Sequence, residues 1–259
     1  MMNLNLSRQH FIVTGCSSGF GKAITEALCQ EGARVTGVAR QQDPLTRMHH
    51  NYPEHFTPVQ GDLLKTDTLD RLEKSIAGKA LHGLVLNAGG PPAKKAIETK
   101  VSDWDNAYQM VFRWKIDLTL RLLPQMIDAG YGRILYIESQ SVKQPIPALA
   151  LSNAMRAGIT GFAKSLSLDV APQGITVNVL APGPHATPAI ERVIEYRSKQ
   201  TGETIEEAKK AMQRAIPIGR FGKAEEIASL TLWLLSEQSA FVTGQTISHA
   251  GGNIGGLFG

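Results

Sequence analysis

The stretch HFIVTGCSSGFGKAITEALCQE, residues 10–31, decides the fold. Its apolar run at residues 11–13 predicts a short buried strand, and a helix with Ile24 and Leu28 on one face is expected after the turn. A strand, a glycine turn and a helix in this order direct backbone N–H groups and a helix N-terminus at a pyrophosphate. The glycines at 15, 19 and 21 suit a tight turn, the approach of a ligand and the packing of helix on strand. The pattern favours a nucleotide-binding turn, and a purely structural turn is the alternative.

The bulk properties are those of one globular α/β domain. The chain has 259 residues, a net charge of +4, 42% hydrophobic residues and 19% charged residues. Its Lys and Arg residues are scattered, so no nucleic-acid partner is expected. No apolar stretch approaches the length of a membrane span and no export signal is evident, so a cytoplasmic protein is expected. The two cysteines and the histidines at 49, 50 and 55 form no recognisable metal motif, so no metal is expected.

Strand-like runs recur along the chain between helical patterns. They cover residues 34–38, 57–60, 83–87, 133–138, 176–181 and 245–249. Helices are expected from Asp67, from Ser102 with Asp105 in the capping position, and over residues 150–170 and 223–236. Apolar strands that alternate with helices predict a doubly wound parallel sheet with helices on both faces, a single Rossmann-type domain over residues 1–259. Ligands are then expected at the C-terminal edge of the sheet.

Residues 184–216 depart from this alternation. The segment begins with prolines and continues with helical patterns, the second of them capped by Thr204 and Glu207. Because it follows the C-terminal end of a strand, it is placed where a lid over a substrate pocket would lie. An extra pair of surface helices is the alternative that the sequence leaves open.

An ordered set of motifs resembles that of the short-chain dehydrogenase/reductase family over nearly the whole chain, most closely its β-ketoacyl-carrier-protein-reductase-like members. The motifs are TGCSSGFG at 14–21, GDL at 61–63, NAGG at 87–90, a serine at 139, PGPHAT at 182–187, GRFGKAEEIA at 219–228 and FVTGQTISHAGG at 241–252. The resemblance implies strand order 3-2-1-4-5-6-7 and hydride transfer between a nicotinamide cofactor and a carbonyl or alcohol. It also implies a homo-oligomer, either a dimer or a tetramer.

The resemblance also assigns cofactor-binding roles to the matching positions. The adenosine and pyrophosphate side would be bound by Gly15, Ser17, Ser18, Gly19, Phe20, Gly21, Asp62, Leu63, Asn87, Ala88 and Gly89, and the nicotinamide side by Arg156, Pro182, Gly183 and Thr187. At the end of the second strand, a carboxylate would accept hydrogen bonds from a ribose 2′-OH and repel a 2′-phosphate. Ala39 and Arg40 stand there instead, and a guanidinium binds phosphate, so NADP(H) is predicted over NAD(H). Alternatively, Arg40 is simply a solvated cation.

The proton-transfer positions depart from the family pattern of Asn, Ser, Tyr and Lys. Val111 stands at the Asn position, Ser152 at the Tyr position and Arg156 at the Lys position, so that only Ser139 matches. Serine is a weaker acid than tyrosine, and arginine does not release its proton. The candidate catalytic residues are therefore Ser139 and Ser152, which would bind the substrate oxygen, and Arg156, which would bind the nicotinamide ribose. Candidate substitute proton donors are Lys143, His185 and Tyr196.

Two functions follow from this departure. An NADP(H)-dependent oxidoreductase with an altered proton relay is favoured by the intact nicotinamide motif at Pro182, Gly183 and Thr187. A catalytically silent NADP-binding homologue, acting as a redox sensor or structural subunit, is favoured by the missing Tyr and Lys, because general acid catalysis contributes about 10²–10⁴-fold to a rate. The oxidoreductase is the working hypothesis.

Overall fold

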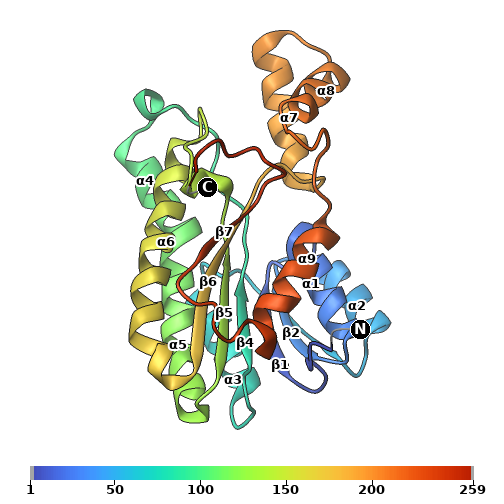
Figure 1. Ribbon diagram of the computed structural model, residues 1–259, viewed down its shortest axis with the longest axis vertical. Coiled ribbons are helices and arrows are strands. Elements are labelled where there is room, and N and C mark those ends of the chain that lie inside the picture. Colours follow the sequence, from blue (N-terminus) through green and yellow to red (C-terminus); the bar gives the residue numbers. More distant parts are fainter. Residues whose placement is uncertain (1–2, 258–259) are drawn as a thin grey trace.

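The computed structural model describes residues 3–257 and contains a seven-stranded parallel sheet (Figure 1). The strand order is β3-β2-β1-β4-β5-β6-β7, with every neighbouring pair parallel. The strands are β1 (His10–Thr14), β2 (Arg34–Ala39), β3 (Phe56–Gln60), β4 (Gly83–Leu86), β5 (Gly132–Ile137), β6 (Ile175–Pro182) and β7 (Thr246–His249). The predicted parallel sheet and its strand order are confirmed.

Helices cover both faces of the sheet, as predicted (Figure 1). One face carries α1 (Gly19–Gln30), α2 (Gln42–Asn51) and α9 (Ala224–Leu235), and the other carries α3 (Thr66–Ile76), α5 (Trp114–Ala129) and α6 (Ala150–Val170). Alternate residues of β1 enter separate cores: Phe11 and Val13 pack beneath α1 and α9, while Ile12 packs beneath α5 and α6. This explains why the strands read as continuous apolar runs. Within residues 3–257, no helix is both long and apolar enough to cross a membrane.

The connection between β4 and α5 differs in detail from the expectation. Helix α4 (Val101–Ala107) begins one residue before Ser102, and the Lys100 N–H donates to Asp103 Oδ2 at 2.9 Å. The capping pair is therefore Lys100 with Asp103, and the predicted pair of Ser102 with Asp105 is wrong. A π-helical turn, Tyr108–Arg113, then joins α4 to α5. This turn rotates the side chains of α5 about the helix axis, relative to the positions they would take in a continuous α-helix.

The segment that departs from the strand–helix alternation forms α7 (Pro188–Thr201) and α8 (Ile205–Arg214), which project beyond the C-terminal edge of the sheet (Figure 1). The capping interaction predicted for α8 is confirmed, since the Glu207 N–H donates to Thr204 Oγ1 at 3.3 Å and the Thr204 N–H donates to Glu207 Oε2 at 2.9 Å. The two helices share a small core of their own, made of Ile194, Ala208, Ile216 and Phe221. The remaining short helices are 3₁₀ turns at Ala96–Glu98, Gln140–Val142, Ala171–Gln173 and Glu237–Ser239.

Candidate active site

The glycine turn and the segment after β4 form a tight cradle at the start of α1. Gly15 and Gly19 adopt positive φ angles of 65° and 51°. A Cβ atom on Gly15 would lie 2.7 Å from the Asn87 carbonyl oxygen, and one on Gly21 would lie 2.2 Å from the Gly15 carbonyl oxygen. Only glycine fits such positions. Thr14 ties the two segments together, because its Oγ1 donates to Asn87 O at 2.8 Å and accepts from the Asn87 N–H at 2.7 Å.

The cradle suits an anionic group. Ser18 is the N-cap of the twelve-residue helix α1, and no acidic residue lies in its first turn. The first N–H groups of this helix, together with its macrodipole, favour negative charge at this end. Ser17 and Gly19 are half-buried beside the cap, whereas Phe20 turns toward the end of β6. The structure therefore offers an anion a glycine turn and a helix N-terminus together.

The chain beyond β3 and β4 and the ends of β6 and β7 also lie at the C-terminal edge of the sheet. Asp62 and Leu63 follow β3, where Asp62 Oδ1 accepts the Leu64 N–H at 3.1 Å and Leu63 packs against the core beneath α3. Ala88 and Gly89 follow Asn87 at the end of β4. Pro182 is the last residue of β6, and the Gly183 N–H donates to His249 O at 3.0 Å.

Thr187 completes the edge and is the N-cap of α7. A Cβ atom on Gly19 would lie 3.6 Å from Thr187 Cβ, so the segment after β6 folds back onto the glycine turn. The segments to which the family resemblance assigns the pyrophosphate and the nicotinamide are thus neighbours.

His185 is engaged inside the protein. Its Nδ1 donates to Gly183 O at 2.8 Å, its Nε2 lies 3.0 Å from His249 Nδ1, and its ring contacts Phe20 edge-on at 5.1 Å between centroids. Burial is the main cause that lowers its pKa. Both ring nitrogens are already bonded, which argues against His185 as a proton donor to substrate. Lys143 lies in an exposed loop and Tyr196 lies on α7, 38% exposed.

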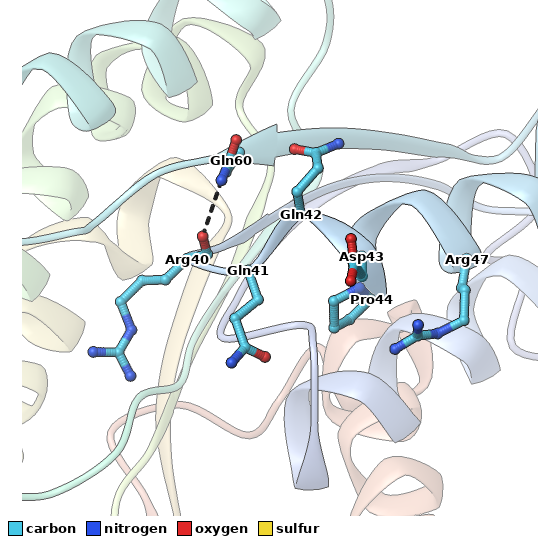
Figure 2. Close-up of a pocket in the computed structure, with 7 residues that line it drawn as sticks. All are labelled: Arg40, Gln41, Gln42, Asp43, Pro44, Arg47 and Gln60. Atoms are coloured by element: carbon cyan, nitrogen blue, oxygen red, sulfur yellow. Dashed lines mark hydrogen bonds between the residues drawn. The ribbon is translucent and has the colours of Figure 1, made fainter.

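A cavity of about 370 Å³ opens at the end of β2. Arg40, Gln41, Gln42, Asp43, Pro44, Arg47 and Gln60 line it (Figure 2). Gln60 Nε2 donates to the carbonyl oxygen of Arg40 at 3.2 Å, which ties β3 to the chain just beyond β2. Arg40 is the cation expected from the sequence, whereas Arg47 on α2 was missed. The only sign of Arg47 in the sequence is that it follows Arg40 as a second arginine, within the first two turns of the helix after β2.

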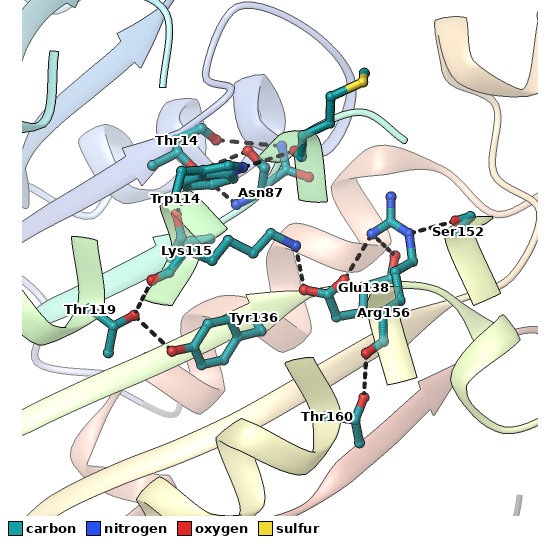
Figure 3. A network of polar contacts seen from close by, with 12 residues as sticks. Thr14, Asn87, Trp114, Lys115, Thr119, Tyr136, Glu138, Ser152, Arg156 and Thr160 are labelled. Carbon is teal, nitrogen blue, oxygen red and sulfur yellow. Dashed lines mark hydrogen bonds and ion pairs between the residues drawn. The ribbon is translucent and has the colours of Figure 1, made fainter. Parts of the chain in front are cut away.

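The sequence also missed a buried ionic cluster at the end of β5 (Figure 3). Glu138 follows β5, Lys115 lies in the first turn of α5 and Arg156 lies on α6. Lys115 Nζ donates to Glu138 Oε1, and Arg156 Nη1 donates to Glu138 Oε2 at 3.0 Å and to the Glu138 carbonyl oxygen at 3.1 Å. The side chains of Lys115, Glu138 and Arg156 are only 1%, 0% and 8% exposed. Three ionised groups from three elements are therefore bonded out of contact with water.

Further hydrogen bonds anchor the Lys115 side of the cluster. Thr119 Oγ1 donates to Lys115 O at 2.7 Å and lies 2.7 Å from the hydroxyl of Tyr136, a buried residue of β5. Burial, the largest cause, lowers the pKa of the Lys115 ammonium to about 8, against the opposing attraction of Glu138. Burial thus brings the pKa of Lys115 closer to neutral pH than the pKa of an exposed lysine.

Ser152 and Arg156 share a helix face, as their spacing predicted. Arg156 Nε donates to Ser152 Oγ at 3.1 Å. A Cβ atom on Gly90 would lie 3.3 Å from Arg156 Nη2 and 3.7 Å from Ser152 Oγ, so both side chains face the segment after β4. Ser139 follows Glu138 directly, and its Oγ accepts the Ser141 N–H at 3.1 Å. Val111 lies in the π-helical turn and is 1% exposed.

The doubly wound sheet and the glycine cradle at its C-terminal edge define a Rossmann-type α/β protein. Residues 15–253 match the family described as Enoyl-(Acyl carrier protein) reductase. The chain is 32% identical over 249 residues to the 3-oxoacyl-[acyl-carrier-protein] reductase FabG of Rickettsia bellii, covering 96% of this chain and 98% of that relative. It is 31% identical over 246 residues to FabG of Thermotoga maritima, covering 93% of this chain and 96% of that relative.

Two solved structures are similar over almost their whole length. One is YwfH, an NADPH dependent reductase involved in bacilysin biosynthesis, with a TM-score of 0.91, 27% identity and coverage of 97% of this chain and 100% of that one. The other is the L-sorbose reductase of Gluconobacter frateurii complexed with NADPH and L-sorbose, with a TM-score of 0.91, 27% identity and coverage of 99% and 100%. The chain belongs to the short-chain dehydrogenase/reductase family, and its relatives include the FabG reductases.

Proposed function

We propose that the protein is an NADP(H)-dependent oxidoreductase that transfers hydride between nicotinamide and a carbonyl or alcohol substrate. The observation that carries the cofactor preference is the cavity after β2, which is lined by the two guanidinium groups of Arg40 and Arg47 against the single carboxylate of Asp43. This excess of positive charge suits a 2′-phosphate. Two neighbours in fold, one described as NADPH dependent and one solved in complex with NADPH, support the same choice.

The glycine cradle, the N-terminus of α1 and the cationic cavity after β2 support binding of a dinucleotide. The glycine cradle and the N-terminus of α1 would hold the pyrophosphate, with the adenosine and ribose bound by Ser17, Ser18, Phe20, Asp62, Leu63, Asn87, Ala88 and Gly89. Pro182, Gly183 and Thr187 would hold the nicotinamide, and Arg156 its ribose. When bound, the cofactor supplies or accepts the hydride.

The catalytic residues in this proposal are Ser139, Ser152 and Arg156, an altered form of the family's relay. The two hydroxyls would hydrogen-bond the substrate oxygen, and the Arg156 guanidinium would stabilise the negative charge that develops on it. Because arginine and serine do not release protons at neutral pH, the proton would be exchanged with solvent, taken up when a carbonyl is reduced and released when an alcohol is oxidised. Helices α7 and α8, within residues 184–216, would cover the substrate as a lid. The protein is proposed to act as a cytoplasmic homo-oligomer.

Binding calorimetry tests the cofactor preference. NADPH is expected to bind at least about tenfold more tightly than NADH, since charge-assisted hydrogen bonds are worth about 1.5–3 kcal/mol. Arg40→Ala and Arg47→Ala should each remove most of this difference and leave NADH affinity within about twofold. Gln42→Ala, which removes an uncharged side chain from the same cavity, is the control. Equal affinities for NADPH and NADH in the wild-type protein contradict the proposal.

Turnover separates the enzyme from a silent NADP-binding protein. The silent alternative is favoured by one observation, that Glu138 already holds both Lys115 and Arg156 inside the fold. NADPH oxidation should be followed with ketones, sugars and β-ketoacyl thioesters. If the protein is an enzyme, Ser139→Ala should lower kcat by about tenfold to a hundredfold with little effect on NADPH affinity. Tight NADPH binding without oxidation of any of these substrates would favour the silent protein.

A further inference from the structure

The cluster at the end of β5 contains two cations and one carboxylate, which leaves one positive charge in a region that is largely buried. Each cation bonds its own oxygen of Glu138: Lys115 takes Oε1 and Arg156 takes Oε2 (Figure 3). The carboxylate is therefore shared between two cations. Its charge cannot fully compensate both of them.

The two cations face different surroundings. Lys115 lies inside the fold, with its Nζ 5.8 Å from the centre of the Trp114 ring. Arg156 faces outward from the cluster, toward Ser152 and the segment at Gly90. Without Lys115, Glu138 and Arg156 would form a neutral pair. The lysine thus keeps a net positive charge on the side of the cluster that faces the proposed cofactor site.

We propose that Lys115 determines which redox form of the cofactor the site prefers: by compensating Glu138, it leaves Arg156 with a net positive charge that favours the uncharged nicotinamide of NADPH over the cationic nicotinamide of NADP⁺. Lys115 touches neither the cofactor nor the substrate, and it acts through Glu138 and Arg156. The inference rests on the proposed function, because it requires the nicotinamide to bind on the Arg156 side of the cluster.

The preference is also expected to depend on pH. The charged groups that face Lys115 are Glu138 from β5 and Arg156 from α6, and Arg156 stays charged at all relevant pH values. Tyr136, joined to the same helix through Thr119, stays neutral because burial raises its pKa further. Loss of the Lys115 proton as the pH rises through about 8 makes the cluster neutral. Preference for NADPH should then weaken.

Calorimetric titration measures the preference as the dissociation constant of NADP⁺ divided by that of NADPH. A larger ratio means a stronger preference for NADPH. The two nucleotides share every phosphate, both riboses and the adenine, so a change in the ratio between variants reports on the nicotinamide ring. Lys115→Met makes the cluster neutral and should lower the ratio about threefold to tenfold, which lies within the range for one unit charge about 10 Å from the ring at an effective dielectric constant between about 20 and that of water. Lys115→Met combined with Glu138→Gln leaves only the charge of Arg156 and should restore the wild-type ratio.

This rescue separates charge from structure, since a merely structural role of Lys115 predicts that the double variant is at least as impaired as the single one. Arg121→Met is the matched control. It removes one cation from the same helix, six residues or about 9 Å along the axis, where Arg121 is surrounded by Asp117, Asp70 and Glu73. Its ratio should stay within about twofold of the wild-type value.

The outcomes distinguish this inference from the proposed function. Measurable binding with the same ratio in the wild-type, single-variant and double-variant proteins overturns the inference alone. If the wild-type protein binds neither nucleotide, the proposed function is wrong and the inference falls with it. Should Lys115→Met fail to fold, the wild-type protein titrated from about pH 7 to about pH 9.5 decides, because a ratio that does not fall across the pKa of Lys115 contradicts the charge mechanism.

Discussion

Glu138→Gln is expected to destabilise the protein severely. The Glu138 side chain is fully buried and bonds two cations that are themselves 1% and 8% exposed. A glutamine retains one acceptor oxygen, but its NH₂ group must then face a donor of Lys115 or Arg156. Removal of one partner from a buried ion pair costs about 3–5 kcal/mol, a large part of the total of about 5–15 kcal/mol for a folded protein.

The deficit in stability should depend on pH, because Lys115 can release its proton. Burial already lowers the pKa of Lys115 to about 8, and loss of the Glu138 charge lowers it further in the variant. Between that lower pKa and about 8, the unfolded variant binds one proton more than the folded variant, whereas wild-type Lys115 is protonated in both states. The deficit should therefore shrink as the pH rises toward 8, by at most about 1.4 kcal/mol per pH unit.

Urea denaturation followed by circular dichroism at about pH 6 and about pH 8 measures both effects, provided that the m-value is unchanged. Glu73→Gln is the control, because Glu73 is 49% exposed and is one of three carboxylates around Arg121. Its effect should stay within about 0.5 kcal/mol. A Glu138→Gln variant within about 1 kcal/mol of the wild-type protein at about pH 6, or a deficit that grows toward pH 8, would refute the account of the cluster.

Three further predictions concern other parts of the chain. Gly21→Ala should abolish NADPH binding in calorimetry, because the new Cβ would lie 2.2 Å from Gly15 O. In contrast, Gly161 lies at an open position on α6, so Gly161→Ala should raise the free energy of unfolding by up to about 1 kcal/mol. The pKa of His10 is lowered to about 4, mainly by burial. Between pH 6.5 and 4 the unfolded state therefore binds more protons than the folded state, and the stability of the protein should fall as the pH falls through this range. His10→Gln should flatten that slope in denaturation experiments. Light scattering should report a mass well above the 28.0 kDa monomer, and a monomer at micromolar concentration contradicts the proposed homo-oligomer.

The fold could be predicted from the sequence because its signals are local. Each strand is an apolar run bounded by polar or glycine residues, and the observed strands lie within one or two residues of the expected ranges. The glycine turn is equally local, because Gly15, Gly19 and Gly21 lie close together in one motif between a strand and a helix, and its contact with Asn87 follows from a second motif at the end of a neighbouring strand. The helix face shared by Ser152 and Arg156 follows from a spacing of four residues.

The ionic cluster could not be predicted, because its contacts join distant positions. Lys115 lies 23 residues and Arg156 lies 18 residues from Glu138 along the chain. Lys115 reads as an ordinary surface cation in a helical pattern, yet the π-helical turn before α5 changes the phase of that helix and the lysine is buried. A carboxylate directly after the apolar strand β5 was the available signal. It indicates that a cation lies nearby without showing which one.

The charge of the cluster bears on the choice between an enzyme and a silent binding protein. The family pattern places one lysine beside its tyrosine, and the sequence predicts that Arg156 takes the lysine position, while Lys115 and Glu138 add one charge of each sign. In the cluster beside the segment at Gly90, the charges of Lys115, Glu138 and Arg156 therefore again add up to one positive charge. Burial of a third charged group costs several kcal/mol of desolvation, and a neutral Glu138–Arg156 pair would avoid that cost. We infer that the site keeps an electrostatic task toward the nicotinamide end of the cofactor, a task that hydride transfer and recognition of the redox state both require.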